Sequence, residues 1–447
     1  MSWKKVKLGE LCIIEKGDIG IQKAIPGEYP MVVTSEERKS HNEFQFDDEA
    51  VIIPLVSGTG HGHASIKRIH FQQGKFALGS ILCAVIPKDK KQLNAEYLYR
   101  FLDLNKDDEL VARMKGMANV TLPMKEIAQI EIPLPTIKGQ LEFVEMYKDL
   151  ETKSDLLSTE LTHQLSLVKK LRQQLLQDAV QGKLVVAPST LERAGGEVDE
   201  PASELLKKIK AEKEQLILKG KIKQGKLQEA EQQNDLHFEI PKNWAWCSLD
   251  EISKNITDGT HQTPIYTKSG RVFLSAQNIK PFKFMPEKHK LVSDETYKEI
   301  IRNRKPEKGD ILVARVGAGI GEAAVIDQDV DFCFYVSLGL IQPFKDYLNT
   351  DYITLVINSP YGVKYAKGNI SSKGGSAGNF NLGRIRSLLI PLPPLLEQNH
   401  IMQKFEEVMQ NCNALEESIK QSALQNEKLL QQVLREALRG VPFEAKK

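Results

Sequence analysis

Two long stretches of the chain repeat apolar side chains at alternating spacings of three and four residues. Each stretch follows an Ile-Pro-Leu-Pro segment, at 132–135 and at 390–393. This alternation is typical of the a/d seam of a coiled coil, and it is sustained for more than four heptads in both stretches. The seam that we assign runs through Leu150, Leu157, Leu161, Val168, Leu171 and Leu175 in the first stretch and through Val408, Leu415, Ile419, Leu429 and Val433 in the second.

The pattern predicts two helices of about 40 residues, each about 60 Å long. The prolines of the preceding segments remove backbone donors and fix φ, so each helix begins just after them. Gly182 and Gly440 follow the last apolar positions and end the helices. A core helix of a globular bundle is the alternative, which we disfavour because such helices seldom run this long. Polar residues such as Ser154 and Asn426 sit on the seam, where they usually fix the register of a helix pair.

The two stretches are copies of one another. Residues 132–182 align without a gap on residues 390–440, an offset of 258, and 13 of the 51 positions are identical. Weaker matches precede them, pairing Trp3 with Trp244, residues 94–97 with 349–352, and residues 79–84 with 309–314. The chain therefore consists of two tandem copies of a globular domain followed by a long helix.

This organisation predicts an α+β protein with two tandem globular α/β domains, each followed by a long helix, the two helices forming an antiparallel coiled coil. An antiparallel pair is the simplest arrangement for two like helices of one chain that each follow their own domain. The linker at 183–243 contains an amphipathic helix rich in charged residues, and we assign it no catalytic or binding role. The predicted segments are a first globular domain at 1–131, a first helix at 132–182, a linker with a charged helix at 183–243, a second globular domain at 244–389, a second helix at 390–440 and a tail at 441–447.

Composition excludes several classes of protein. The chain has 61 Lys and Arg against 59 Asp and Glu, a net charge of +2, which excludes a strongly basic DNA-coating protein but not local basic faces. The five cysteines are never spaced Cys-x-x-Cys, which argues against a disulfide framework or a cysteine-rich zinc site and favours a reducing, cytoplasmic location. No uncharged apolar run reaches about 18 residues, so we expect no membrane span, and the first twenty residues lack a signal-peptide pattern.

Two motifs resemble parts of catalytic sites. Gly317-Ala-Gly319-Ile-Gly321 is similar to a glycine-rich nucleotide loop, and Asn358-Ser-Pro-Tyr361 is similar to the Asn-Pro-Pro-Tyr motif of adenine methyltransferases. The tetrapeptide lacks its first proline and reads as the end of a helix, and the glycines follow no strand–GxGxxG–helix pattern. We interpret the glycines as a turn between strands.

Other catalytic signals are weak. His61 and His63 could form half of a metal site, but no further ligand cluster is recognisable, so a polar loop is the preferred interpretation. The sequence has no GxxxxGK[ST] phosphate loop, so we expect no ATP hydrolysis. We predict a non-catalytic chain that carries no metal and no cofactor of its own.

Both globular domains are rich in side chains that suit nucleic acid. Arg, Lys, Gln and Asn can make bidentate contacts to base edges, and hydroxyl groups suit phosphates. The candidates in the first domain are Thr34, Ser35, Arg38, Lys39, Ser57, Thr59, His61, His63, Lys67 and Arg68. The candidates in the second domain are Thr260, His261, Gln262, Thr263, Ser275, Gln277, Asn278, Arg315, Asn369, Ser371, Ser372 and Lys373.

The whole chain resembles the specificity subunit of type I restriction–modification systems. The residues that carry the resemblance are Ile390–Gln398 and Leu429–Gly440 with their copy at 132–182, the linker at 195–223, and the segments 258–264 and 309–317. The first copy departs from the pattern at Pro135-Thr-Ile-Lys-Gly-Gln140, where we expect the helix to start less cleanly.

The resemblance implies a division of labour among subunits. Each globular domain would be a target-recognition domain that reads one half of a split sequence in double-stranded DNA. The paired helices would set the gap between the halves and dock two methyltransferase subunits, which would use S-adenosylmethionine to methylate adenine N6. A restriction and translocase subunit would add cleavage that depends on ATP and Mg²⁺.

Two alternatives remain open. A coiled-coil adaptor whose domains bind proteins would show no affinity for DNA, even at low salt. A standalone DNA methyltransferase would bind S-adenosylmethionine by itself.

Overall fold

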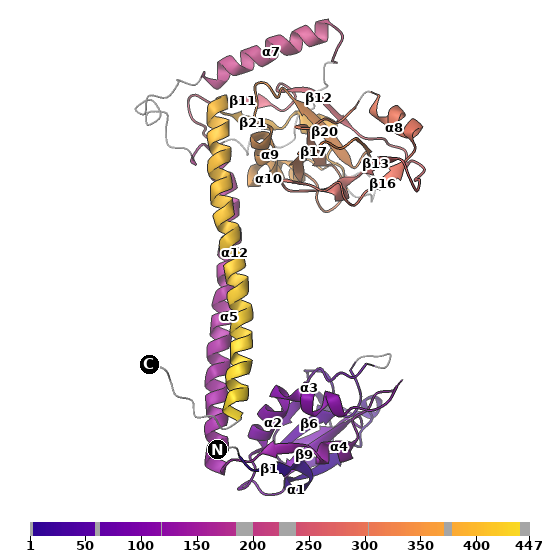
Figure 1. The fold of residues 1–447 in the computed structure, drawn as a ribbon, viewed down its shortest axis with the longest axis vertical. Coiled ribbons are helices and arrows are strands. Elements are labelled where there is room, and N and C mark those ends of the chain that lie inside the picture. Colours follow the sequence, from indigo (N-terminus) through magenta and orange to yellow (C-terminus); the bar gives the residue numbers. More distant parts are fainter. Residues whose placement is uncertain are drawn as a thin grey trace. The chain divides into compact units, whose positions relative to one another are not determined.

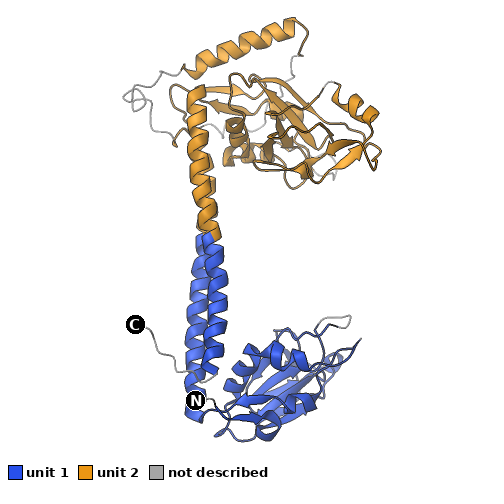
Figure 2. Ribbon diagram, viewed as in Figure 1, with its two compact units in different colours: residues 1–164, 418–447 blue, residues 165–417 orange. Residues whose placement is uncertain are grey.

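The computed structural model describes residues 3–58, 63–117, 119–184, 200–222, 238–302, 304–370 and 378–438. The chain divides into two compact units (Figure 2). The first contains residues 1–164 with 418–447, and the second contains residues 165–417. Each unit therefore combines one globular domain, the beginning of the helix that follows this domain, and the end of the other long helix.

The first unit is built on two four-stranded sheets (Figure 1). One has the strand order β2-β9-β6-β7 and the other β4-β3-β8-β5, while β1 pairs with β10. Its elements are β1 (Lys5–Lys7), α1 (Leu8–Leu11), β2 (Cys12–Lys16), β3 (Tyr29–Val32), β4 (Lys39–His41), β5 (Phe46–Asp47), β6 (Ala50–Pro54), β7 (His70–Gln72), β8 (Lys75–Leu78), β9 (Leu82–Pro87), α2 (Ala95–Leu104), α3 (Lys106–Glu109), α4 (Met124–Ala128), β10 (Glu131–Pro133) and the first part of α5 (Ile137–Val180). Strands β6 and β9 are buried along their whole length and form the centre of the core.

The second unit has the same plan. Its main sheet has the order β12-β20-β17-β18, a second sheet has the order β16-β13-β19, and β11 pairs with β21. Its elements are α7 (Ala202–Leu218), β11 (Ala245–Ser248), β12 (Ser253–Asp258), β13 (Arg271–Leu274), β14 (Ile279–Lys280), β15 (Lys283–Phe284), β16 (Lys290–Val292), α8 (Asp294–Ile301), β17 (Ile311–Ala314), β18 (Ala323–Val325), β19 (Phe332–Phe334), β20 (Leu338–Pro343), α9 (Thr350–Asn358), α10 (Pro360–Gly368), α11 (Leu382–Arg386), β21 (Leu389–Leu392) and the first part of α12 (Leu395–Leu438).

The strand orders confirm the tandem repeat and correct one of its anchors. In each unit a strand of the second sheet runs parallel to a later strand, β3 with β8 and β13 with β19. The predicted match of residues 79–84 with 309–314 is wrong, because these segments lead into β9 and β17. Strand β9 corresponds in the sheet order to β20, and β17 corresponds to β6. A glycine followed by apolar residues is typical of any buried strand that follows a turn, so this short match had little discriminating power.

The two long helices begin and end at equivalent positions. Helix α5 covers 44 residues and so does α12, and their first residues, Ile137 and Leu395, differ by the offset of the repeat. The expectation that the first helix starts less cleanly is therefore wrong. Gly182 follows α5 with φ +70° and ends it as expected, whereas Gly440 lies outside the described residues.

The side-chain contacts between the two helices pair them antiparallel. In the first unit the side-chain amide of Asn426 donates to the hydroxyl oxygens of Ser154, at 2.9 Å, and Ser158, at 3.3 Å. In the second unit Arg172 pairs with Glu416 and donates to Asn413 at 2.7 Å. The helix pair is thus held in register by polar side chains as well as apolar ones.

The apolar seam differs from the predicted one at four of its eleven positions. Leu161, Val168, Leu175 and Ile419 are buried, and Leu150, Val408 and Val433 are half-buried. Leu157, Leu171, Leu415 and Leu429 are 44–60% exposed, so these four leucines lie outside the seam. The residues one step further along, which include Ser158, Arg172 and Glu416, face the partner helix in their place. The hydrophobic pattern alone assigned the four leucines to the seam, because it could not anticipate that polar pairs would form between the helices.

Each domain holds the start of its helix through a buried glutamine. The side chain of Gln140 accepts from the main-chain N–H of Asn94 at 2.8 Å and donates to the carbonyl oxygens of Gln92 and Pro135. Gln398, at the equivalent position, accepts from Asn349 N–H and donates to the Pro393 carbonyl, both at 2.9 Å. Neither glutamine has any exposed surface.

The far end of each helix enters the core of the other repeat's domain. Leu434 and Leu438 of α12 are buried in the main core of the first unit. Ala179 and Val180 of α5 are buried in the main core of the second unit, together with Ile209 of α7. The charged linker helix is therefore not wholly solvated: its apolar side packs on the second domain. None of the helices within the described residues is long and apolar enough to cross a membrane.

We predict that Leu161→Asp lowers the melting temperature of the chain, whereas Leu157→Asp, four residues earlier on the same helix, does not. Leu161 is 7% exposed and Leu157 is 45% exposed. An unpaired carboxylate buried between helices costs on the order of 3 kcal/mol, while an exposed one costs little. Differential scanning calorimetry of the two variants checks this, and equal melting temperatures would contradict the assigned seam.

Candidate nucleic-acid interface

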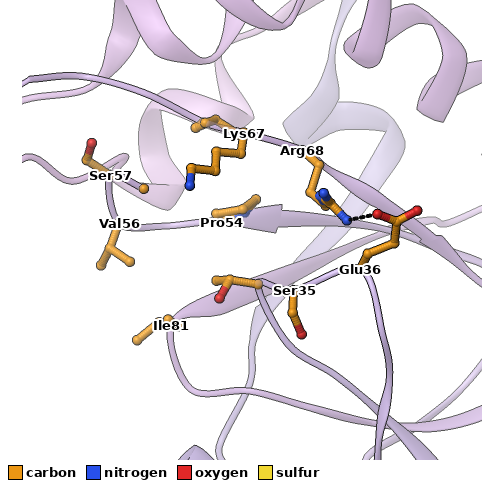
Figure 3. Close-up of a pocket in the computed structure, with 11 residues that line it drawn as sticks. Ser35, Glu36, Pro54, Val56, Ser57, Lys67, Arg68 and Ile81 are labelled. Carbon is orange, nitrogen blue, oxygen red and sulfur yellow. Dashed lines mark hydrogen bonds and ion pairs between the residues drawn. The ribbon is translucent and has the colours of Figure 1, made fainter. Parts of the chain in front are cut away.

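Several of the predicted residues of the first domain line one hollow (Figure 3). It has a volume of about 520 Å³, and it lies where the loops that follow β3 and β6 meet the segment before β7. The residues around it are Thr34, Ser35, Glu36, Pro54, Val56, Ser57, Gly58, Ile66, Lys67, Arg68 and Ile81. The segments 34–36, 54–58 and 66–68 thus bring hydroxyls and cations together around apolar side chains.

The two cations of the hollow are held differently. Arg68 donates to the Glu36 carboxylate at 2.7 Å, and this pair is exposed to solvent. The Lys67 side chain extends towards the side of the hollow where Ser57 lies, as Figure 3 shows. The Ser57 hydroxyl donates to the carbonyl of His63 and accepts from Ser65 N–H, so it closes the loop between them. Of the two cations, Arg68 therefore forms an ion pair with Glu36, whereas Lys67 extends into the hollow.

Arg38 lies next to the hollow and is firmly anchored. Its Nε donates to Gln72 and its Nη1 donates to the Glu36 carbonyl and approaches Nδ1 of His70, each at 3.1 Å. A guanidinium can only donate, so Nδ1 of His70 must be the acceptor. Burial, and secondarily Arg38 and Arg68, lower the pKa of His70 to about 4, which keeps the ring neutral at pH 7. Lys39 is exposed on the neighbouring strand β4.

Glu36, His70 and Gln72 are the residues that sequence reasoning missed in this domain. They hold the predicted basic residues Arg38 and Arg68 in place. The only signal in the sequence was the alternation His70-Phe-Gln72, which is compatible with many edge strands. Thr59 and His61 lie outside the described residues.

In the second domain the segment 258–264 is fixed to the end of β19. Thr260 N–H donates to the Phe334 carbonyl at 3.0 Å, and Val336 N–H donates back to Thr260 at 2.9 Å. Gly259 is required here, since a Cβ at this position would lie 2.1 Å from the Phe334 oxygen. His261, Gln262 and Thr263 follow on the exposed side.

Asp258 and Arg315 support this segment from inside the domain. Arg315 is 4% exposed and donates to the Asp258 carboxylate at 2.5 Å, to the Val336 carbonyl at 3.0 Å and to the Phe380 carbonyl at 3.1 Å. The same carboxylate lies 3.2 Å from Nε2 of His261, whose side chain is 71% exposed. Arg315 is therefore a support for the loop, and we leave it out of the proposed contact surface.

Arg304 is a further supporting residue that sequence reasoning missed. Its guanidinium donates to the carbonyls of Asp258 and Gly259, both at 2.8 Å. The basic run at 302–308, in which Arg302 and Lys305 are exposed, was the available signal.

The remaining predicted residues of the second domain divide into internal and exposed ones. Ser275 and Asn278 form a reciprocal capping box, and Asn278 is buried and donates to the Met285 and Lys288 carbonyls. Gln277 between them is exposed. Asn369 is buried and donates to the Tyr365 carbonyl. Ser371, Ser372 and Lys373 lie outside the described residues.

The motif that is similar to a methyltransferase signature has a structural role. The buried side chain of Asn358 accepts from Ala323 N–H at 2.9 Å and donates to the Ala323 carbonyl at 2.8 Å. Helix α9 ends at Asn358, as the sequence predicted, and Ser359 caps the next helix, α10. The glycines 317–321 connect β17 to β18, which confirms the predicted turn between strands.

The structure offers no recognisable metal site among the side chains that it describes. No group of three or more His, Cys, Asp or Glu residues in that part of the chain is placed to hold an ion. All five cysteines are buried as free thiols, and burial raises the pKa of the Cys83 thiol to about 12.

Comparison with known proteins places the chain among restriction–modification proteins. The family described as type I restriction modification DNA specificity domain matches residues 1–166 and 241–425. The chain is 29% identical, over 307 residues, to the type I restriction enzyme EcoAI specificity subunit of Escherichia coli. That match covers 65% of this chain and 48% of the relative, so it spans about half of the relative's length.

Solved structures share the fold. The HsdS subunit from Thermoanaerobacter tengcongensis is 16% identical, with a TM-score of 0.57, and the match covers 98% of this chain and 97% of that one. A second solved structure, described as the structural basis of complex assembly and conformational transition of the type I R-M system, contains a chain that is also 16% identical to this one. The match has a TM-score of 0.56 and covers 98% of both chains. Because the family matches two regions that together make up most of the sequence, this chain belongs to the type I restriction modification DNA specificity domain family.

Proposed function

We propose that this chain is the DNA sequence-specificity subunit of a type I restriction–modification complex and is not itself catalytic. Each globular domain reads one half of a split sequence in double-stranded DNA. The observation that carries the proposal is the repeated plan of the two units, in a chain of this family, with a polar loop surface supported from within each domain. We keep 1–131 and 244–389 as the proposed limits of the two recognition domains.

The proposed contact surface contains exposed and half-buried side chains, most of them on supported loops. In the first domain it comprises Thr34, Ser35, Arg38, Lys39, Ser57, Lys67 and Arg68, and in the second His261, Gln262, Thr263 and Gln277. Supported loops suit base readout because bidentate contacts require side chains whose direction is fixed before the DNA arrives. Phosphate contacts need only charge, which the basic run beside the second loop supplies.

The exposed leucines support docking of two methyltransferase subunits on the helices. Leu157 corresponds to Leu415 and Leu171 corresponds to Leu429 in the repeat, and all four are exposed. The first unit carries Leu157 and Leu429, and the second carries Leu415 and Leu171, so each unit has the same two apolar positions. Two equivalent surfaces favour two copies of one partner.

The chemistry belongs to the partners in this proposal. The methyltransferase subunits bind S-adenosylmethionine and methylate adenine N6, and a restriction and translocase subunit uses ATP and Mg²⁺. The chain itself selects the DNA sequence, in the cytoplasm, at which these subunits act. Its polar Asn358 motif is occupied by main-chain partners, which argues against a standalone methyltransferase.

Co-expression with the cognate methyltransferase subunit should create a split N6-methyladenine motif in the host DNA. We expect two half-sites at one fixed gap, detected by sequencing that reports the modified base, with the methyltransferase subunit expressed alone as the control. Formation of a stable complex without any new motif would instead support the protein adaptor.

Leu157→Asp with Leu429→Asp should reduce the number of bound methyltransferase subunits from two to one. A charge on the apolar contact disfavours docking at the first unit and leaves the second unit unaffected. Native mass spectrometry of the complex measures this, and Leu171→Asp with Leu415→Asp should give the same result. Leu218→Asp, which alters an exposed leucine of α7, is the matched control and should keep both partners. Retention of both partners by the double variants would place docking elsewhere.

The unfolding free energy of the first unit should fall as the pH drops from about 6.5 towards 4. The pKa of His70 is about 4 in the folded chain and 6.5 for an ordinary histidine, so in this window the unfolded chain binds a proton that the folded chain does not. The loss reaches about 2 kcal/mol near pH 5, because burial, and after it the positive charges of Arg38 and Arg68, disfavour protonation of the folded ring, with Glu36 opposing them only weakly. Urea titrations at several pH values check this, and His70→Asn should flatten the dependence while keeping an acceptor for Arg38. An equal slope in both proteins would exclude His70 as the cause.

A further inference from the structure

One bulky residue of the second domain has an unusual backbone conformation. Phe282 has φ +64°, and it is the non-glycine residue with positive φ among the residues that the structure describes. It lies at the tip of the hairpin in which Lys280 of β14 pairs with Lys283 of β15. Pro281 precedes it, and a proline followed by a positive φ is the pattern of a type II turn, which normally has glycine at the second position. A phenylalanine there is strained, so something around it must hold it in place.

The ring of Phe282 is held against the long helix α12. Its centroid lies 5.8 Å from that of Phe405, which is buried in the main core of the second unit. The main-chain N–H of Phe282 donates to the Ala323 carbonyl at 3.0 Å, which fixes the tip to β18. Lys280 adds an ion pair to Glu322 at 3.7 Å. The strained turn therefore directs an aromatic side chain at the helix, although the ring remains 38% exposed.

The same hairpin is part of the core that supports the 258–264 loop. Ile279 and Phe284 are buried in a separate apolar cluster with Phe332 and Phe334 of β19. Phe284 and Phe332 have ring centroids 5.6 Å apart. The 258–264 loop is hydrogen-bonded to Phe334 at the end of that strand. Phe282 thus connects the part of the domain that carries the loop to the helix on which the domain stands.

The first unit contacts the equivalent helix position in another way. Phe405 corresponds in the repeat to Tyr147, which is buried. Arg100 of α2 lies 4.2 Å from the centroid of the Tyr147 ring and forms an ion pair with Glu151 at 3.0 Å. Each long helix therefore has an aromatic residue about three turns from its start that its own domain contacts. The contact comes from a cation in one copy and from a strained aromatic hairpin in the other.

We infer that Phe282 is a positioning residue that fixes the angle between the second recognition domain and α12 and, through that angle, the gap length at which the chain accepts two half-sites. The part that concerns the gap rests on the proposed function, whereas the part that concerns the angle does not. Phe282 reads no base in this proposal. Its loss loosens the domain on its helix and leaves the reading loop unchanged.

The angle can be measured without DNA or partners. Spin labels at Glu299→Cys on α8 and Gln410→Cys on α12 report the distance between the domain and the helix within the second unit, since both positions are exposed and all five native cysteines are buried. We expect a narrow distance distribution in the labelled parent, a broad one in Phe282→Ala and Phe282→Gly, and a narrow one again in Phe282→Tyr. Tyr266→Ala, which removes another exposed aromatic ring of the same unit, should stay narrow.

Phe282→Gly separates strain from contact. Glycine adopts φ +64° without cost, so this variant keeps the turn and loses only the ring. If Phe282→Gly keeps the narrow distribution, the ring does not hold the helix and the inference is overturned. A narrow distribution in Phe282→Ala would overturn it as well. Circular dichroism of each variant verifies that the chain is folded.

The gap is tested in the complex with the methyltransferase subunit. Plasmids carry the two half-sites at the native gap and at gaps one base pair longer and shorter. Phe282→Ala should lower the preference for the native gap by about tenfold, with both half-site sequences unchanged. An unchanged preference, or a changed base within a half-site, would overturn the link to the gap. If the unaltered chain directs no split motif, the proposed function fails, and the spin-label distances still decide the role of Phe282.

Discussion

The hydrogen bonds of one buried glutamine in each repeat determine how a globular domain joins its long helix. Gln140 and Gln398 have no exposed surface, and their amides bond to main-chain groups of the domain and of the segment that leads into the helix. A buried amide without partners is costly, so each glutamine keeps the helix start in one position relative to the loop before α2 or α9. Tyr97 and Tyr352 reinforce this junction through hydrogen bonds to the carbonyls of Pro133 and Pro391. Without a fixed junction, no long helix could hold a recognition surface in a defined direction.

Polar side chains in this protein serve two separate purposes. Arg315, Asn278 and Asn358 are buried, and main-chain groups occupy most of their hydrogen-bonding capacity, so they stabilise loops and strand ends. Exposed residues such as His261 and Gln262 lie on a loop that Arg315 helps to hold in place through the Asp258 carboxylate and the Val336 carbonyl. The proposed readout of bases would need this division, because a side chain that is ordered only on binding loses part of its contact energy to entropy.

The helix pair has polar side chains at its interface and exposed leucines on its outer surface. Asn426 with Ser154, and Arg172 with Glu416, occupy the interface where leucines would stabilise more strongly but would also tolerate a shifted register. Four of the leucines that the heptad pattern favours for the seam are exposed instead. A coiled coil that exposes four repeat-equivalent leucines is poorly suited to stand alone, and the two units present the same pair.

The sequence by itself determined the repeat, the two long helices, the stop at Gly182 and the family resemblance, because these depend on local periodicity and on an ungapped match. It also located the loops that carry hydroxyl and basic residues. Only the tertiary structure decided which of those residues are exposed. The burial of Arg315 depends on Asp258 and Phe380, which lie more than 50 residues away in the chain, and the anchoring of Arg38 depends on His70 and Gln72. The phase of the seam was likewise decided by polar pairs between helices about 250 residues apart, since the periodicity of one helix cannot reveal which face its partner covers.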